Sequence, residues 1–395
     1  MKPLLIHTPE GVKDLYGKEC EDKLYIEHCI RKTLRRFGYH PIQTPTFEFL
    51  NIFDTSIGSV DEKELFRFFD REGNTLALRP DITPAIARCV SKYYYDEMMP
   101  VRLYYLGNTF INNLSYQGHL KEATEAGAEL IGDDSIEADA ELITMSIESL
   151  KACGLNNFLF SIGHAGFYEG MVKKSGLDED VAQKITQLIL NRNFLEIGEL
   201  FTSLNVNNKL KQLFTMLGDY YPDDKSLDKL CDYAQEYPDV YDAVSRLKQV
   251  YNVLKYYGVE EYVTFDPGMP EMHKYYTGVI FNAYAYGSGQ PVVKGGRYDK
   301  LLERFGKNNC AMGFTITIDR LLEALIKNGA SFPKRKNKVL ILFTEDNKKR
   351  AIEMARQRRK SDENVEILKY KPSITDDDYK EYAQKYEFNE IIELK

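Results

Sequence analysis

The chain has 395 residues and a formal net charge of −8 at pH 7, and 43% of its residues are hydrophobic. This length allows two or three domains with a sizeable core. The acidic balance argues against a nucleic-acid-binding protein, which usually carries a basic surface. No run of about 18 apolar residues predicts a membrane span, and the N-terminal segment is too polar for a signal peptide. Six scattered cysteines without a CxxC pair indicate reduced thiols in the cytoplasm.

Residues 20–37 predict an amphipathic helix, because apolar residues recur among charged ones at helical spacing. These apolar residues are Leu24, Ile30, Leu34 and Phe37. Residues 39–53 then predict one strand with Pro45 inside it. A proline within a strand belongs at a sheet edge or at a distortion, so we expect this strand to be peripheral.

A hairpin followed by a helix is predicted next. The hairpin turns at Gly73 and Asn74. The helix is expected to begin with Thr83 as its N-cap and Pro84 at the first helical position, since both residues favour those places. A further helix is expected over 135–153, where apolar residues are spaced for one face.

A second, longer hairpin lies between these two helices. Its return strand places Glu125, Gly127 and Glu129 on one face, because side chains alternate along a strand. Two carboxylates that point the same way suggest a ligand platform. The outgoing strand ends at Ile111 and offers no cation there, so the positive partner of this acidic wall is not evident.

The rest of the chain predicts the domain organisation. Residues 165–257 are almost entirely helical in pattern, which suggests a helical insertion in a core of residues 1–328. Strands resume after the insertion, so the fold class is α+β with an antiparallel sheet flanked by helices. A basic linker over 333–338 precedes residues 334–395, where strands and helices alternate as β-α-β-α-β, a small parallel α/β unit.

Several catalytic signatures are missing from the sequence. We find no GxxxxGK[ST] phosphate loop, no GxGxxG after a first strand, and no GxSxG elbow. The six histidines show no metal-ligand spacing. The glycine-rich stretch "YGSGQPVVKGGRYD" is a weak signal by itself, since hairpin turns use glycine equally often.

Several segments, taken together and in order, resemble a histidyl-tRNA synthetase, a class II aminoacyl-tRNA synthetase. "GYHPIQTPTFE" resembles motif 1, with Pro45 at its place in the dimer interface. Residues 109–132 resemble motif 2, and "AMGFTITIDRLLEAL" resembles motif 3. "LALRPDITPAIAR", "MHKYYTGVIF" and "KGGRYDKLL" resemble segments that line the histidine pocket. The resemblance covers residues 8 to about 325 and implies a synthetase-like fold.

The resemblance also implies a histidine-binding pocket without cofactor or metal. Its expected residues are Asp81, Thr83, Glu125, Glu129, Tyr275, Tyr276 and Tyr298. In this interpretation Glu129 holds the α-ammonium group, since a carboxylate is the natural partner of that cation, and Asp81 or Glu125 faces the imidazole. Arg320 is a vestige of motif 3. The simpler alternative is that the acids are solvated polar residues and that Tyr275 and Tyr298 belong to the core or an interface.

The residues that handle ATP in a synthetase are replaced. Ile111 stands where the resemblance places an arginine for the α-phosphate, and Asn113 stands where it places a glutamate. Glu271 occupies the position of a second arginine, and Thr317 replaces a motif 3 glycine. Loss of one preorganised group of this kind typically costs on the order of 10²–10³ in rate. We therefore expect no amino-acid activation.

This profile resembles the regulatory subunits of ATP phosphoribosyltransferase, which are inactive paralogues of histidyl-tRNA synthetase. That resemblance implies a cytoplasmic, non-catalytic subunit that activates the short-form catalytic subunit and confers histidine feedback in the first step of histidine biosynthesis. It also implies a homodimer within a hetero-oligomer, and no tRNA binding, because residues 334–395 match only the start of an anticodon-binding domain. Two alternatives remain: a histidyl-tRNA synthetase with displaced arginines, and an inactive paralogue with another partner.

Overall fold

The computed structural model of the chain describes residues 6–53, 60–113, 120–175, 177–204, 206–269, 276–333 and 337–395. The chain folds into two compact units, Met1–Ala330 and Ser331–Lys395. Besides the strands and α-helices, short 3₁₀ helices occupy Leu50–Phe53, Glu62–Glu64, Glu260–Tyr262, Leu302–Phe305 and Glu345–Asn347.

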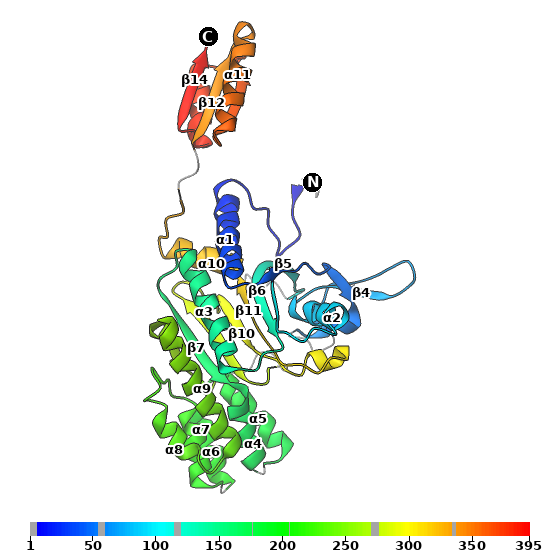
Figure 1. The fold of residues 1–395 in the computed structure, drawn as a ribbon, viewed down its shortest axis with the longest axis vertical. Coiled ribbons are helices and arrows are strands. Elements are labelled where there is room, and N and C mark those ends of the chain that lie inside the picture. The colour runs from blue at the N-terminus through cyan, green and yellow to red at the C-terminus, as the bar shows by residue number, and fades with distance from the viewer. Residues whose placement is uncertain are drawn as a thin grey trace. The chain divides into compact units, whose positions relative to one another are not determined.

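An eight-stranded sheet forms the centre of the first unit (Figure 1). From one edge to the other its strands are β1 (His40–Pro41), β5 (Val101–Phe110), β6 (Glu122–Ile131), β11 (Ala311–Thr317), β10 (Val293–Arg297), β9 (Val279–Ala285), β7 (Phe158–His164) and β8 (Val263–Phe265). The six central strands pair antiparallel, and only the outermost pairs, β1 with β5 and β7 with β8, are parallel. The expected antiparallel sheet is confirmed.

Helices cover one face of this sheet at β6. Ala126, Ala128 and Leu130 are fully buried, and they alternate along β6 with the acidic residues of the other face. Three helices contact β6 and close this side: α1 (Gly17–Arg36), α3 (Ile136–Ala152) and α10 (Ile318–Lys327). In α1 the buried apolar stripe is Ile26, Ile30 and Leu34. Leu24, expected on that stripe, is 57% exposed.

Residues 39–53 do not form the single strand that their pattern suggested. β1 pairs within the large sheet, whereas β2 (Phe47–Phe49) joins a separate three-stranded sheet in the order β2-β4-β3, with β4 (Thr75–Leu78) and β3 (Arg67–Phe69). Pro45 lies at the break between them. A proline has no N–H to donate to a ladder, and here the Arg79 guanidinium donates to the carbonyl oxygens of Thr44 and Pro45.

The helix α2 (Thr83–Tyr93) begins as expected, but Thr83 is not its N-cap. Ile82 holds that position, and a carboxylate oxygen of Asp81 accepts the backbone N–H of Thr83 at 3.0 Å. Pro84 lies in the first turn, where its missing N–H costs nothing. The Thr83 hydroxyl is thereby available for a contact outside the helix.

Six helices separate β7 from β8 and gather at one end of the first unit (Figure 1). They are α4 (Ala165–Ser175), α5 (Glu179–Leu190), α6 (Phe194–Ser203), α7 (Asn208–Met216), α8 (Asp228–Ala234) and α9 (Pro238–Tyr257). The last helix ends at Gly258 in the left-handed conformation, as glycine permits. Helix α9 also packs along α3, which connects the helical segment to the sheet.

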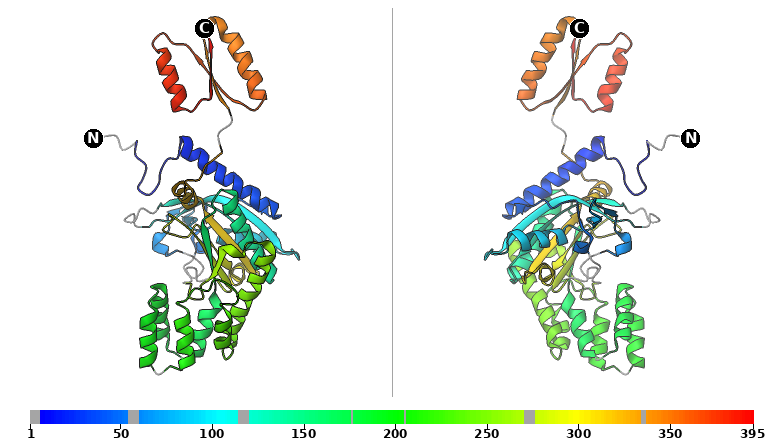
Figure 2. Two further views of the ribbon diagram at one scale, coloured as in Figure 1. Left: turned by 90° about the vertical axis from the view of Figure 1, so that its left-hand side faces the viewer. Right: turned by 90° about the vertical axis from the view of Figure 1, so that its right-hand side faces the viewer.

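The second unit has the expected β-α-β-α-β order. Its elements are β12 (Lys338–Phe343), α11 (Lys348–Lys360), β13 (Asn364–Lys369), α12 (Asp376–Lys385) and β14 (Glu390–Leu394). The three strands are parallel in the order β13-β12-β14. Alternate residues of β12 pack against α11 on one face and against α12 on the other, so the two helices cover opposite faces of the sheet (Figure 2).

Candidate functional site

A cavity of about 1270 Å³ lies over the face of the large sheet that carries Glu125 and Glu129, and side chains of α10 also reach it. Strands β5, β6, β10 and β11 contribute to its lining, together with the N-termini of α2 and α10. Of the residues suspected from the sequence, those that line the cavity are Asp81, Thr83, Glu125, Glu129, Tyr276, Tyr298 and Arg320. Tyr275 lies outside the described residues.

Glu129 forms the closed end of the cavity. Its side chain is only 1% exposed. The Thr83 hydroxyl donates to one carboxylate oxygen at 2.7 Å, and the Tyr298 hydroxyl donates to the other. Burial raises the pKa of Glu129 to about 8, although both hydroxyl donors act in the opposite direction. Glu129 is thus a fixed and easily protonated acid.

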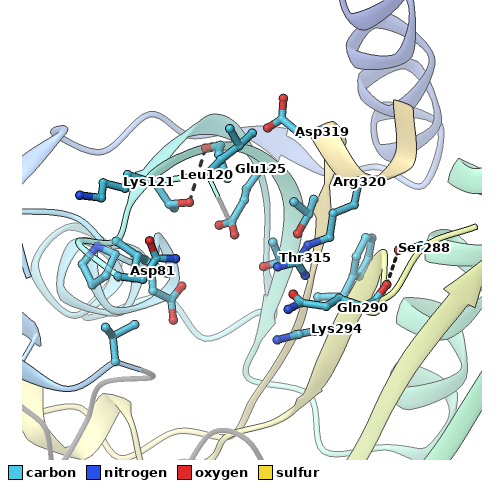
Figure 3. Close-up of a pocket in the computed structure, with 18 of the residues that line it drawn as sticks. Asp81, Leu120, Lys121, Glu125, Ser288, Gln290, Lys294, Thr315, Asp319 and Arg320 are labelled. Atoms are coloured by element: carbon cyan, nitrogen blue, oxygen red, sulfur yellow. Dashed lines mark hydrogen bonds between the residues drawn. The ribbon is translucent and has the colours of Figure 1, made fainter. Parts of the chain in front are cut away.

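Glu125 lies four residues earlier on the same face of β6 and points into the open part of the cavity. Figure 3 shows its carboxylate and that of Asp81 facing the same space. Burial raises the pKa of Glu125 to about 8, and the nearby negative charge of Asp81 adds to this effect. Arg320 and Lys294 lower the same pKa. A positive group of a ligand placed beside Asp81 and Glu125 would stabilise both carboxylates.

Two glycines make room for polar side chains at the floor of the cavity. A Cβ atom at Gly127 would stand 2.5 Å from the Tyr105 hydroxyl oxygen and 2.2 Å from the Phe314 carbonyl oxygen. The Tyr105 hydroxyl is hydrogen bonded to the Thr315 hydroxyl at 2.5 Å. At Gly313 a Cβ atom would collide with the Glu129 carboxylate. Only glycine fits at either position without displacing these groups.

Two cations of the cavity lining supply the positive partner that the sequence left open for the acidic residues. Lys294 on β10 and Arg320 in the first turn of α10 lie across the cavity from Asp81 and Glu125 (Figure 3). Burial lowers the pKa of both cations. Lys294 was not among the residues suspected from the sequence. Its period-two spacing from Tyr298, the residue that directly follows β10, was the available signal.

Other residues of the quoted motifs serve the fold and do not line the cavity. Arg79 anchors the break at Pro45 and also donates to the Asn108 carbonyl oxygen at 2.8 Å. Arg297 is buried and binds Asp139 of α3 through two nitrogens, at 3.0 and 2.5 Å. These arginines stabilise the frame around the site.

The positions at which residues that handle ATP are replaced can be placed in part. Ile111, Asn113 and Thr317 all line the cavity, so the wall where the resemblance places an arginine is aliphatic at Ile111. Glu271 lies outside the described residues. Among the described residues, no group of three or more His, Cys, Asp or Glu side chains could hold a metal ion. None of the described helices has the length and apolar character to cross a membrane.

Known proteins share this architecture. The family model for histidyl-tRNA synthetase matches residues 11–321. A histidyl-tRNA synthetase from Nostoc sp. PCC 7120 has a TM-score of 0.80, covers 97% of this chain and 90% of its own, and is 20% identical in sequence. At that identity the likeness concerns the fold alone. It confirms the expected class II synthetase-like architecture.

Relatives with a higher sequence identity have a different name from these synthetases. An "ATP phosphoribosyltransferase regulatory subunit" from Acetivibrio thermocellus is 37% identical over 92% of this chain and 86% of its own length. One from Ruminiclostridium cellulolyticum is 34% identical over 99% of this chain and 92% of its own. A crystal structure from Bacillus halodurans C, described as "ATP phosphoribosyltransferase regulatory subunit/histidyl-tRNA synthetase", has a TM-score of 0.88 at 31% identity, covering 100% of this chain and 99% of its own. The chain therefore belongs to the family of ATP phosphoribosyltransferase regulatory subunits, non-catalytic proteins with a histidyl-tRNA synthetase-like fold.

Proposed function

We propose that this chain activates a short-form ATP phosphoribosyltransferase catalytic subunit and makes the complex sensitive to histidine. The observation that carries the proposal is the composition of the cavity. The cavity contains a fixed acid that accepts hydrogen bonds from hydroxyl groups, an arrangement suited to a small amino acid. Its wall at Ile111 is aliphatic. A cavity of this kind retains ligand recognition without the charges that adenylate formation requires.

The histidine pose that we propose exchanges the roles expected from the sequence. The ammonium group lies against Asp81 and Glu125, whose carboxylates face the open cavity. The imidazole enters the closed end and donates an N–H to Glu129. A carboxylate offers about four acceptor sites, so Glu129 can accept this donor beside Thr83 and Tyr298. We propose that Tyr276, which also lines the cavity, packs beside the ring.

We further propose that the chain forms a homodimer through the small sheet. Strand β2 has an inverted pattern: Glu48 is buried and paired with Arg88 at 2.6 Å, whereas Phe47 and Phe49 point outward. On β3 Phe69 is 73% exposed. Exposed aromatic groups on one small sheet indicate an interaction surface, and Pro45 lies directly before it. A second copy of the chain is the partner that we propose.

We propose that the chain does not bind tRNA, and one helix of the second unit is the feature that argues against this. Helix α11 is rich in basic residues, as nucleic-acid-binding helices often are. Several of these charges are engaged within the unit, since Arg358 pairs with Glu390 at 2.6 Å and Arg359 donates to the Val365 carbonyl oxygen. A gel-shift titration with histidine tRNA at physiological salt separates the two possibilities, and a specific shift would favour the synthetase alternative.

The experiment that tests the function is reconstitution with a short-form catalytic subunit from the same source. We expect the two chains to co-purify and the rate of phosphoribosyl-ATP formation to rise well above that of the catalytic subunit alone. Added histidine should then lower the rate. If the chains do not associate and the rate is unchanged, the chain is a paralogue that serves another partner, and the proposal fails.

A further inference from the structure

The register of the large sheet places Lys294 at a defined point of the cavity. Lys294 pairs with Thr315 on the neighbouring strand, and Thr315 pairs with Gly127. Directly paired residues point to the same face of a sheet. Lys294 therefore shares a face with the two glutamates and lies level with Gly127, midway between Glu125 and Glu129 along the strand direction.

The spacing across the sheet suits a small zwitterion. Two strand spacings separate Lys294 from Gly127, roughly 10 Å between backbones at about 4.8 Å each. The Tyr105 hydroxyl fills the space over Gly127 and is hydrogen bonded to the Thr315 hydroxyl, so no charged side chain of β6 or β11 stands in this row between the acids and Lys294. Carboxylates of Asp81 and Glu125 stand on one side of the opening, and Lys294 and Arg320 stand on the other (Figure 3).

The two cations differ in their contacts with the rest of the protein. Arg320 donates to the Pro291 carbonyl oxygen at 3.1 Å, which fixes its guanidinium. Among the described residues, no carboxylate lies within ion-pair distance of the Lys294 ammonium. A half-buried ammonium without an ion pair bears a desolvation cost, and the adjacent Arg320 charge adds repulsion, which the charges of Glu125 and Asp81 oppose. An anionic group delivered by a ligand would relieve both.

We propose that Lys294, supported by Arg320, binds the carboxylate of an α-amino acid whose ammonium group lies against Asp81 and Glu125. The site is a zwitterion cradle, defined by these four residues. This inference rests on the proposed histidine effector and assigns its carboxylate partner. It also gives the ligand carboxylate a cation, although Glu271 occupies the position where the resemblance places the second arginine. The side chain of the ligand then points toward Glu129.

Calorimetric titration of the full chain with histidine and with histamine, which lacks the carboxylate, tests the cradle. We expect histamine to bind about 10- to 150-fold more weakly than histidine, the usual range for loss of one charge-assisted contact. In Lys294→Met this ratio should fall toward one, because histidine loses its partner while histamine loses none. The matched control is Lys229→Met, since Lys229 is an exposed lysine of α8 that does not line the cavity; it should keep the wild-type ratio.

Each outcome decides a different point. If wild type binds histidine and histamine equally, the cations do not hold the carboxylate and the cradle is wrong, whatever the stability of Lys294→Met. If Lys294→Met keeps the wild-type ratio, Lys294 is not the partner. If neither compound binds the chain, the cradle and the proposed effector site both fail, while activation of the catalytic subunit remains a separate result of the reconstitution.

Discussion

Gly313 and Glu129 are directly paired across β11 and β6, and a Cβ atom at Gly313 would stand 1.7 Å from a carboxylate oxygen of Glu129. The glutamate can occupy the closed end of the cavity only because its cross-strand neighbour has no side chain. The position of the acid is therefore encoded on a strand that carries no charged residue at this point.

Substitution Gly313→Ala should displace the Glu129 carboxylate from Thr83 and Tyr298. We expect histidine affinity to fall at least 10-fold, since a hydrogen bond to a charged group contributes about 1.5–3 kcal/mol. Calorimetric titration measures this. Gly198→Ala, in helix α6, where the new Cβ would stand 3.9 Å from the Lys211 side chain, is the control and should bind normally. Unchanged affinity in Gly313→Ala would show that Glu129 takes no part in binding.

The raised pKa of Glu129 predicts a pH-dependent stability. Because its folded-state pKa of about 8 exceeds the ordinary value of 4.5, the folded chain binds the proton more tightly than the unfolded chain. Its contribution to stability is complete below about pH 4.5 and is lost as pH rises through 8, by at most about 1.4 kcal/mol per pH unit. Glu129→Gln does not titrate and should flatten this slope.

Urea unfolding of wild type and Glu129→Gln between pH 5 and pH 8 measures the difference. Glu125 adds a slope of the same sign that both proteins retain. The exposed Glu303 supplies the control, and Glu303→Gln should keep the wild-type slope. Parallel slopes for wild type and Glu129→Gln would mean that Glu129 is ionised throughout this range.

The dimer proposal predicts that aromatic residues of the small sheet hold two copies together. Wild type should sediment as a dimer at micromolar concentration, and Phe47→Ser combined with Phe49→Ser should give a folded monomer. Tyr256→Ser, which changes an 89% exposed residue of α9, should leave the dimer intact. A monomeric wild type, or a dimer that survives both serines, would exclude this surface as the interface.

Amino-acid activation should be absent. We expect no histidine-dependent exchange of pyrophosphate into ATP, because Ile111 presents an aliphatic group where the α-phosphate would need a cation. Ile111→Arg alone should not restore exchange, since Glu271 still replaces the second arginine. Exchange above the no-enzyme blank by the wild-type chain would support the synthetase alternative.

The sequence predicted those parts of the site that depend on local periodicity. Alternation along β6 was enough to place Glu125 and Glu129 on one face, and the motif resemblance brought Asp81, Thr83 and Tyr298 to the same cavity. The cation partner could not be found in this way, because Lys294 reaches the acids only through the strand order β6-β11-β10. The distance between these residues along the sequence does not show that their strands are close in the sheet.

Two predictions of local structure were wrong for the same reason. Residues 39–53 have a strand-like pattern, but their backbone divides between two sheets at a point that the distant Arg79 stabilises. Thr83 has the composition of an N-cap, but its hydroxyl bonds to Glu129, 46 residues later. In both cases a long-range hydrogen bond overrides the local preference, and local patterns cannot reveal such a contact.

The most direct test of the whole account is a histidine titration of phosphoribosyl-ATP synthesis by the assembled complex, with wild type and Glu125→Gln compared. If histidine acts through this cavity, the concentration that halves the rate should rise about 10- to 150-fold in Glu125→Gln, since one charge-assisted contact with the ammonium group is lost. The Glu303→Gln complex should match wild type. Equal half-inhibition concentrations in Glu125→Gln and wild type would contradict the account and place the effector outside the cavity.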